Sequence, residues 1–345
     1  MKQSYDAKKY LSEFWTPTLN GYHPDWYDKN AKLISRKPGC SVISYQCNGT
    51  GILYDYSIFP GIDLIFMDFN CSDIFDEPNE MRNVLEIRHY QEGRVEFEFE
   101  GDKVFHLQQD EFCVNGMLNM PARYSFPFDY CSGLSLVLDK NSMTEVTRSQ
   151  LALFQIDISV LEEDLDTAHQ WYICKTPPSM CHVFEELYAA KEHETSQYFR
   201  IKVLELLYHA TKLRKEDRVA ATYYAREHIE IVKRVRKAML KDLSRSTPLE
   251  QFLRGEAIST VTFQTIFKQI YGRSPYAYLK HYRMNSAAVQ LRESNESINQ
   301  IALSLGYSNA SKFARAFRDV FGVLPKDYRT AQKALVFGLF STLHL

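Results

Sequence analysis

The chain has 345 residues, of which 45% are hydrophobic and 24% charged, enough apolar material for packed cores in two or three domains. Residues 1–14 (MKQSYDAKKYLSEF) contain no apolar stretch and predict no signal peptide, while the apolar run at 334–340 (ALVFGLF) is too short to span a membrane. Seven cysteines without a C-x-x-C pair favour reduced thiols in a cytoplasmic protein over disulfides or a zinc framework.

The net charge of −2 conceals an uneven distribution along the chain. Residues 229–330 carry 17 lysines and arginines against 8 acidic residues, whereas residues 1–228 carry 23 against 35. A basic carboxy-terminal third on an acidic remainder favours a module that binds a polyanion such as DNA.

Residues 40–139 have the pattern of short strands. In RVEFEFE, Val95, Phe97 and Phe99 alternate with glutamates and therefore share one face of a strand. Turn signals at Gly93 and Gly101 separate such segments, which recur about every 8–12 residues. This spacing predicts one antiparallel barrel or sandwich.

Helical patterns begin near Thr144. Residues 177–179 (PPS) provide a start signal for a helix that reaches about Lys191. The following helix has a single broad apolar stripe, which packs either on its own domain or on a partner in a dimer. The stripe consists of Phe199, Val203, Leu206, Leu207, Ala210 and Leu213.

The carboxy-terminal third contains an internal repeat. Six pairs of residues are 50 positions apart, and upstream of them the offset becomes 49. Two copies are too few for a solenoid, so the pattern indicates a duplicated motif. The pairs at offset 50 are Phe263/Phe313, Phe267/Phe317, Lys268/Arg318, Gly272/Gly322, Pro275/Pro325 and Tyr278/Tyr328; those at offset 49 include Leu249/Ile298, Phe252/Ile301, Leu253/Ala302 and Ala257/Gly306.

Each copy has the physical features of a helix-turn-helix. In the second copy, Ala302 leaves room for a crossing helix, and Gly306 accepts the positive φ that turns the chain. Ser308 or Asn309 caps the second helix. Phe313 and Phe317, one turn apart, anchor that helix to the core. Such a helix enters the major groove of DNA.

A rigid spacer connects the two copies. Ser274 and Pro275 begin a predicted helix that reaches about Glu293 and is about 28 Å long at 1.5 Å per residue. Because one duplex repeat is about 34 Å, a single chain of this design spans two successive major grooves on one side of the DNA.

Residues 229–329 resemble the DNA-binding domain of the AraC/XylS-type transcription regulators. The second copy, IALSLGYSNASKFARAFRDVFGVLPKDYR, follows the signature of that family almost throughout. More weakly, EIRHYQEGRVEFEF and FPFDYCSG are similar to the cupin-like regulatory domains of some members.

The resemblance implies positions for DNA contacts. Arg315 is suited to a bidentate contact with guanine and Gln264 to adenine, while Lys268 and Arg318 are expected to hold phosphates. The expected base-contacting positions are Thr260, Val261, Gln264 and Thr265 on the first recognition helix and Ala310, Ser311, Lys312 and Arg315 on the second.

The first copy departs from the family pattern. Leu253 stands where the family has a small alanine, and Ala257 stands where it has glycine. Leucine widens the helix crossing, and alanine is strained if the corner needs a positive φ. The first recognition helix carries no arginine, so we expect it to read bases less strongly than the second.

In the family, the amino-terminal domain binds a small effector and forms dimers. We therefore expect a homodimer that acts on double-stranded DNA and on RNA polymerase, as an activator, with no cofactor and no metal site. Candidates for the lining of a moderately apolar effector pocket are Tyr54, Phe66, Phe97, Phe99 and Phe126.

Two alternatives remain at this point. The acidic amino-terminal half also suits docking of a protein partner that controls the same DNA-binding function. A metal-dependent cupin enzyme needs paired histidines, whereas the strand region offers only His89 and His106, 17 residues apart. No catalytic motif supports an enzyme.

The expected fold class is α+β, with an antiparallel cupin-like β-barrel and following helices joined to an all-α double helix-turn-helix domain. The predicted parts are residues 1–145 (regulatory barrel), 146–220 (helical dimerisation or linker region), 221–330 (DNA-binding domain) and 331–345 (hydrophobic tail).

Overall fold

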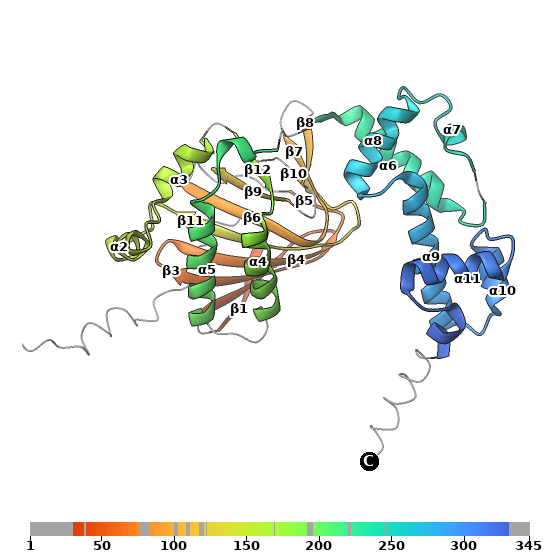
Figure 1. Cartoon of the computed structure of the whole chain (residues 1–345), viewed down its shortest axis with the longest axis horizontal. Coiled ribbons are helices and arrows are strands. Elements are labelled where there is room, and N and C mark those ends of the chain that lie inside the picture. Colours follow the sequence, from red (N-terminus) through yellow and green to blue (C-terminus); the bar gives the residue numbers. More distant parts are fainter. Residues whose placement is uncertain are drawn as a thin grey trace, which may run out of the picture. The chain divides into compact units, whose positions relative to one another are not determined.

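The computed structural model describes residues 30–330 except 38, 76–82, 100–102, 108–110, 117–120, 122, 169, 192–195, 220–221 and 246. The chain forms two compact units, Met1–Tyr223 and Tyr224–Leu345 (Figure 1). The predicted hydrophobic tail, residues 331–345, lies outside the described residues. No helix in the described part is long and apolar enough to cross a membrane. The division into four parts stays a prediction.

Two antiparallel sheets form the body of the first unit. The large sheet has the strand order β1-β2-β3-β4-β11-β6-β9-β12, and the smaller one contains β8-β7-β10-β5. The predicted antiparallel domain is therefore confirmed, with its strands in two sheets that do not close into one barrel. The strands are β1 Ala31–Lys37, β2 Cys40–Tyr45, β3 Gly49–Phe59, β4 Ile62–Cys71, β5 Asp73–Phe75, β6 Val84–Gly93, β7 Val95–Phe99, β8 Lys103–Leu107, β9 Glu111–Gly116, β10 Arg123–Ser125, β11 Cys131–Asp139 and β12 Tyr172–Lys175.

The last strand of the large sheet lies in a region that the sequence predicted to be helical. β12 pairs with β9 through Tyr172↔Val114 and Ile173↔Cys113, and both Tyr172 and Ile173 are buried. Its four residues are too few to show a period of their own, so only the pairing with a distant strand defines it.

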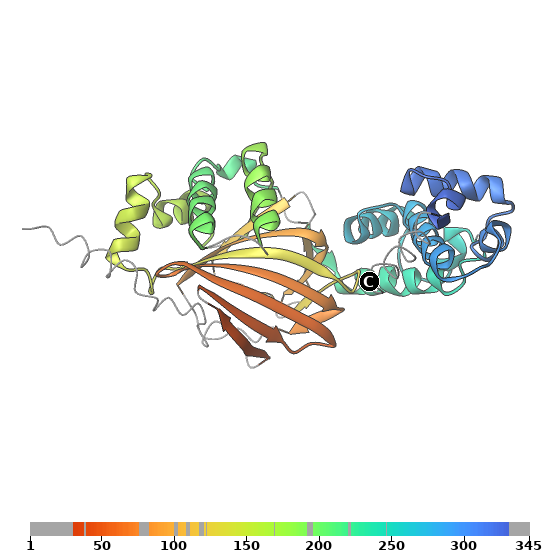
Figure 2. The ribbon, with the colours of Figure 1, turned by 90° about the horizontal axis from the view of Figure 1, so that it is seen from below.

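Helices cover one face of the large sheet (Figure 2). A hydrophobic core lies between these helices and the sheet, and the apolar stripe of α5 is buried in it. Of the two possibilities for this stripe, its own domain or a dimer partner, the structure favours its own domain. The ring of Phe199, for example, lies 4.8 Å from Tyr56 and 5.7 Å from Phe66, centroid to centroid. The helices are α2 Glu145–Leu153, α3 Ile158–Leu165, α4 Pro178–Ala190 and α5 Ser196–Ala210, followed by the short 3₁₀ helix η2 Lys215–Asp217.

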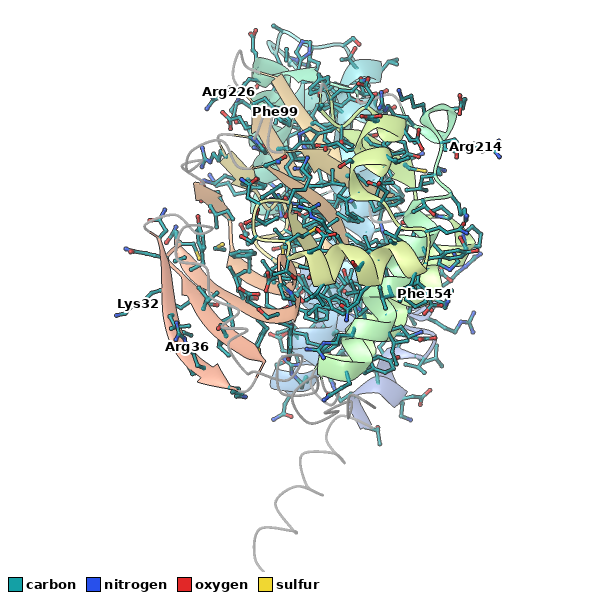
Figure 3. The ribbon with its side chains drawn as sticks, turned by 90° about the vertical axis from the view of Figure 1, so that its left-hand side faces the viewer. Lys32, Arg36, Phe99, Phe154, Arg214 and Arg226 are labelled. Carbon is teal, nitrogen blue, oxygen red and sulfur yellow. The ribbon has the colours of Figure 1, made fainter. Side chains whose placement is uncertain are left out.

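A second core contains residues of both sheets. Phe97 is fully buried, with Trp171 at 4.9 Å and Tyr124 at 5.5 Å between ring centroids. At the edge of the large sheet, β1 carries the exposed cations Lys32 and Arg36 (Figure 3). Charged side chains on an edge strand disfavour pairing with another chain.

The second unit is helical and repeats itself in space as it does in sequence. The rings of Phe267 and Tyr271 lie 4.6 Å apart, as do those of Phe317 and Phe321. The helices are α6 Arg226–Lys241, α7 Leu249–Phe252, α8 Thr260–Tyr271, α9 Pro275–Glu293, α10 Ile298–Ser304 and α11 Ala310–Phe321, with the two-residue strand β13 Tyr224–Ala225 ahead of them.

Candidate nucleic-acid interface

The two predicted recognition helices, α8 and α11, begin and end at residues that define them locally. Ser259 caps α8 by accepting a hydrogen bond from the backbone N–H of Thr262, and Asn309 caps α11 by accepting one from Lys312. Both helices end on a left-handed glycine, at φ 74° for Gly272 and 75° for Gly322. These caps satisfy backbone groups that the helices leave open, so each helix is fixed over its 12 residues.

The corner of the second helix-turn-helix is built on Gly306, which has φ 80°. A Cβ there would lie 2.8 Å from the carbonyl oxygen of Ser244 and 2.9 Å from that of Leu243. The predicted positive φ is therefore confirmed, and close packing adds a second reason for glycine.

The corner of the first copy differs from the one that we predicted. The positive φ falls on Gly255, at 87°, and not on Ala257, so the expected strain at alanine does not arise. α7 has only four residues against seven in α10, and the turn begins earlier in the chain. Leu253 follows α7 and is buried, as a large apolar residue requires.

The aromatic anchors hold both recognition helices from beneath. Phe263 and Phe267 in α8, and Phe313 and Phe317 in α11, are completely buried. α8 and α11 both pack on α9, which has 19 residues and follows a Ser274–Pro275 start, as predicted (Figure 1).

The opposite faces of the two helices are open to solvent. On α8, Gln264, Thr265 and Lys268 are exposed, and Val261 is 73% exposed. The hydroxyl of Thr265 donates to the carbonyl oxygen of Val261 at 3.0 Å, so its hydrogen is already used within the helix. Thr260 is partly exposed.

On α11, Ser311, Lys312, Arg315 and Arg318 are exposed and Ala310 is partly so. The side chains of Lys268, Lys312, Arg315 and Arg318 form no hydrogen bond or ion pair with any described residue. A cation without a protein partner keeps its charge and donors available to a phosphate or a base.

Several other arginines of this unit have structural partners. Arg283 donates to the backbone carbonyl of Arg245 at 2.7 Å, and Arg329 donates to that of Glu296 at 2.7 Å. Arg236 donates to the Tyr278 hydroxyl at 2.8 Å. Sequence reasoning did not separate these arginines from those of α11, because each partner lies more than 30 residues away.

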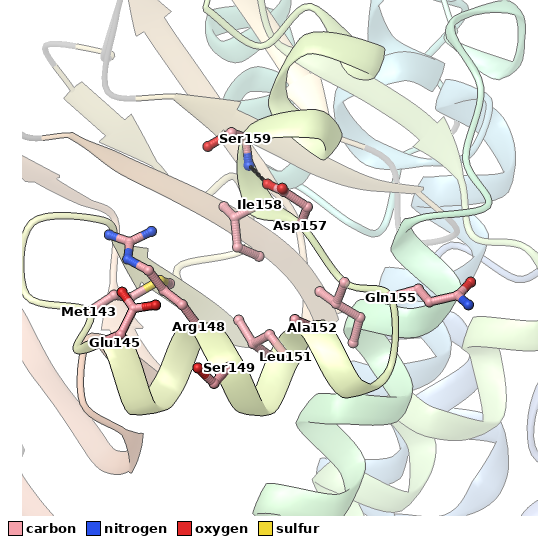
Figure 4. A pocket seen from close by; sticks show the side chains of 11 residues that line it. Met143, Glu145, Arg148, Ser149, Leu151, Ala152, Gln155, Asp157, Ile158 and Ser159 are labelled. Atoms are coloured by element: carbon pink, nitrogen blue, oxygen red, sulfur yellow. Dashed lines mark hydrogen bonds between the residues drawn. The ribbon is translucent and has the colours of Figure 1, made fainter.

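The five effector-pocket candidates fall into two groups. Tyr54 and Phe66 pack in the core beneath the helices, whereas Phe97, Phe99 and Phe126 pack in the core that contains both sheets. An open pocket beside α2 and α3 is lined by residues between 143 and 159, none of them a candidate (Figure 4). The assignment of an effector pocket thus stays a prediction.

The two histidines of the strand region have separate environments. His89 stacks on Phe184 at 4.1 Å, and its Nδ1 lies 3.0 Å from the Tyr188 hydroxyl. His106 is buried with its Nε2 2.9 Å from a carboxylate oxygen of Glu96. They belong to no group of three metal ligands among the described residues.

Known proteins resemble the chain mainly over its second unit. A family described as "Helix-turn-helix domain" matches residues 254–331. A putative AraC-like transcription regulator of Streptomyces lividans is 38% identical over 89 residues, 26% of this chain and 29% of that protein. The activator RhaR of Mannheimia succiniciproducens is 23% identical over 249 residues, 69% of this chain and 76% of its own.

Among solved structures, the C-terminal domain of AraT from Geobacillus stearothermophilus is 32% identical and covers 29% of this chain and 84% of its own, with a TM-score of 0.28. The first curated relatives are matched over only 29% and 31% of their length, so the resemblance concerns a part of each protein. Over its helix-turn-helix unit, the chain is similar to AraC-like transcription regulators.

Proposed function

We propose that this protein is a sequence-specific DNA-binding transcription regulator whose activity is controlled through its amino-terminal unit. One observation carries the proposal: the two capped helices α8 and α11 expose the cations Lys268, Lys312, Arg315 and Arg318, which pair with no described residue, beside exposed polar side chains such as Gln264 and Ser311. A helix of about 28 Å connects them, which suits two successive major grooves about 34 Å apart.

The two helices divide the recognition unequally. α11 offers Arg315 for a bidentate contact with guanine, whereas α8 offers Gln264 for adenine and the exposed Val261 for thymine methyl groups. Lys268 and Arg318 hold phosphates and set the register. The remaining positions, Thr260, Thr265, Ala310, Ser311 and Lys312, lie at the base edges or beside them.

The rest of the proposal concerns partners. The protein acts as a cytoplasmic homodimer and as an activator that contacts RNA polymerase; RhaR and CfaD, two of its relatives, are named as activators. Its amino-terminal unit binds a small effector and carries no enzymatic activity. Control by a protein partner is the alternative, supported by the acidic balance of residues 1–228.

The test compares Arg315→Ala with Lys268→Ala on duplexes enriched by the wild-type protein from a random pool. Arg315→Ala is expected to weaken specific binding by about 1–3 kcal/mol and to relax the preference at one base pair. Lys268→Ala is expected to weaken all sequences alike and to reduce the slope of log K against log salt by about 1.

Arg234→Ala is a control with the same change of charge. This arginine lies on α6, and its guanidinium is already paired with Glu256, so DNA binding should stay at the wild-type level. An equal loss on every sequence for Arg315→Ala would contradict the assignment of a base contact. Failure of the wild-type protein to enrich any sequence would contradict the proposed function itself.

A further inference from the structure

Three potential metal ligands meet on the outer surface of the helix pair α4–α5, outside the DNA-binding unit. Glu205 and His209 are one turn apart on α5, and His182 projects from α4. One ligand atom of each residue lies within 4.8 Å of the others. His182 Nε2 is 3.0 Å from Glu205 Oε1, and the two imidazole rings are 6.1 Å apart.

The buried faces of the two helices hold these ligands in place. Val183 and Phe184, which follow His182, are buried, as are Leu206 and Leu207 next to Glu205. Both helices pack into the core over the large sheet, so their backbones are fixed relative to each other. The ligands themselves are exposed or half-buried and can adjust.

We infer that His182, Glu205 and His209 form a zinc site that links α4 to α5. Two imidazoles and one carboxylate are a known ligand set for zinc, with water at the fourth position. Bond lengths of about 2.0–2.2 Å place tetrahedral ligand atoms about 3.4 Å apart. The His182 Nε2–Glu205 Oε1 pair is already closer than that, and the widest pair needs to close by at most about 1.4 Å through side-chain rotation.

The electrostatics of the cluster favour a cation in spite of a nearby lysine. Lys202 binds Glu205 through the other carboxylate oxygen, Oε2, at 2.8 Å, and it also pairs with Glu186. Two carboxylates and one ammonium leave a local charge of −1 when the histidines are neutral. The metal would take Oε1 and one nitrogen of each imidazole, and a neutral His182 bound through Nε2 would carry its proton on Nδ1.

The alternative is an ion-pair network that binds no metal. In that case the imidazoles only extend the contacts of Glu205 with Lys202. If the cluster binds a metal, its nitrogen-rich ligand set selects zinc and its neighbours in the transition series over magnesium or calcium. A zinc titration distinguishes the metal site from the ion-pair network. Filling the site would tie α4 to α5, two of the helices that cover the large sheet, and would stabilise the first unit.

The experiment titrates zinc into the full chain, stripped of metal with a chelator, against a chromogenic competitor. Wild-type protein should bind one equivalent, and His182→Ala and His209→Ala should each bind at least about tenfold more weakly, since loss of even an indirect support costs about that much. His228→Ala, in the other unit, is the matched control and should equal wild type. All seven cysteines stay in every variant, so a difference reports on the cluster.

A second measurement distinguishes loss of the zinc site from misfolding of the variants. Zinc should raise the thermal transition followed by tryptophan fluorescence in wild type and in His228→Ala, and should leave it unchanged in the two cluster variants. Their metal-free transitions should match that of wild type, because the side chains are not in the core. Equal zinc affinity in wild type and both cluster variants, or no binding at all by wild type, would overturn the inference.

Discussion

At the scale of single residues, the same side chain has different roles in different places. Arg283 is buried and supports the backbone near Arg245, while Arg315 and Arg318 project into solvent. The excess of basic residues in 229–330 therefore overstates the charge that can face a ligand. On α8 and α11, the exposed cations Lys268, Lys312, Arg315 and Arg318 have no competing partner among the described residues.

His89 illustrates how burial changes a titratable residue. The ring stacks on Phe184 and contacts Tyr188, and burial lowers the pKa of His89 to about 4. Between that value and about 6.5, the unfolded chain binds a proton that the folded chain does not. The free energy of unfolding should therefore decrease as the pH falls through this window.

We expect His89→Phe to remove this part of the acid sensitivity. The aromatic stack is retained, but the group that titrates is gone. Relative to the variant, wild type should lose up to about 3 kcal/mol of unfolding free energy between pH 6.5 and 4. Urea unfolding followed by tryptophan fluorescence measures it, since Trp171 is buried in the first unit.

The difference in unfolding free energy between wild type and His89→Phe is the quantity to compare, because Asp63 changes the stability of both with pH in the opposite direction to His89. Burial raises the pKa of Asp63 to about 7, so the folded chain holds that proton and stability falls as the pH rises from about 4 to 7. This contribution is present in both proteins and cancels. Parallel stability curves for wild type and His89→Phe would contradict the pKa shift.

At the scale of elements, the duplicated helix-turn-helix tolerates a change in its corner. One copy turns at Gly306 and the other at Gly255, yet α8 and α11 keep the same length, the same glycine cap and the same aromatic anchors. The recognition helices are fixed by their own caps and buried phenylalanines. The corner therefore needs only one residue with a positive φ between the two helices of each copy, and its exact position can differ.

Gly306→Ala is expected to destabilise the second unit more than Gly322→Ala. Both positions have a positive φ, which costs alanine about 1 kcal/mol. A Cβ at Gly306 also meets two backbone carbonyls, whereas one at Gly322 meets nothing within 4 Å. We expect a total loss of about 2–4 kcal/mol for Gly306→Ala and of about 1 kcal/mol for Gly322→Ala.

Circular dichroism at the helical band follows the helices of both units, so the part of its transition that does not coincide with the tryptophan signal measures the unfolding of this unit. The tryptophan-monitored transition of the first unit serves as the internal control and should be the same in both variants. Equal losses for the two substitutions would show that close packing at Gly306 contributes nothing.

At the scale of the whole molecule, the chain joins a unit of two sheets and covering helices to a helical unit with two candidate recognition helices. The proposed regulation requires that a signal received by the first unit alter the action of the second. The nature of the signal can be tested through Trp171, which is buried in the core of the first unit.

A small effector should stabilise the first unit by mass action. At 100 times its dissociation constant, the gain is about 2.7 kcal/mol, which raises the tryptophan-monitored melting temperature. A screen of metabolites against the full chain, with the same compounds tested on an unrelated protein, provides the measurement. Stabilisation only by added protein fractions would favour the alternative, control by a docking partner.

By itself, the sequence determined the strand-rich first unit, the duplicated helix-turn-helix, the ends of α9 and the buried phenylalanine pairs of α8 and α11. These features depend on caps, glycines and apolar spacing within a few residues, so local physical rules are sufficient. Only the tertiary structure decided that β12 joins the large sheet, that the first corner uses Gly255, and that the aromatic candidates divide between two cores. It also decided which arginines have partners among the described residues and that His182 meets Glu205 and His209. Each of these depends on how distant segments pack, which no local pattern encodes.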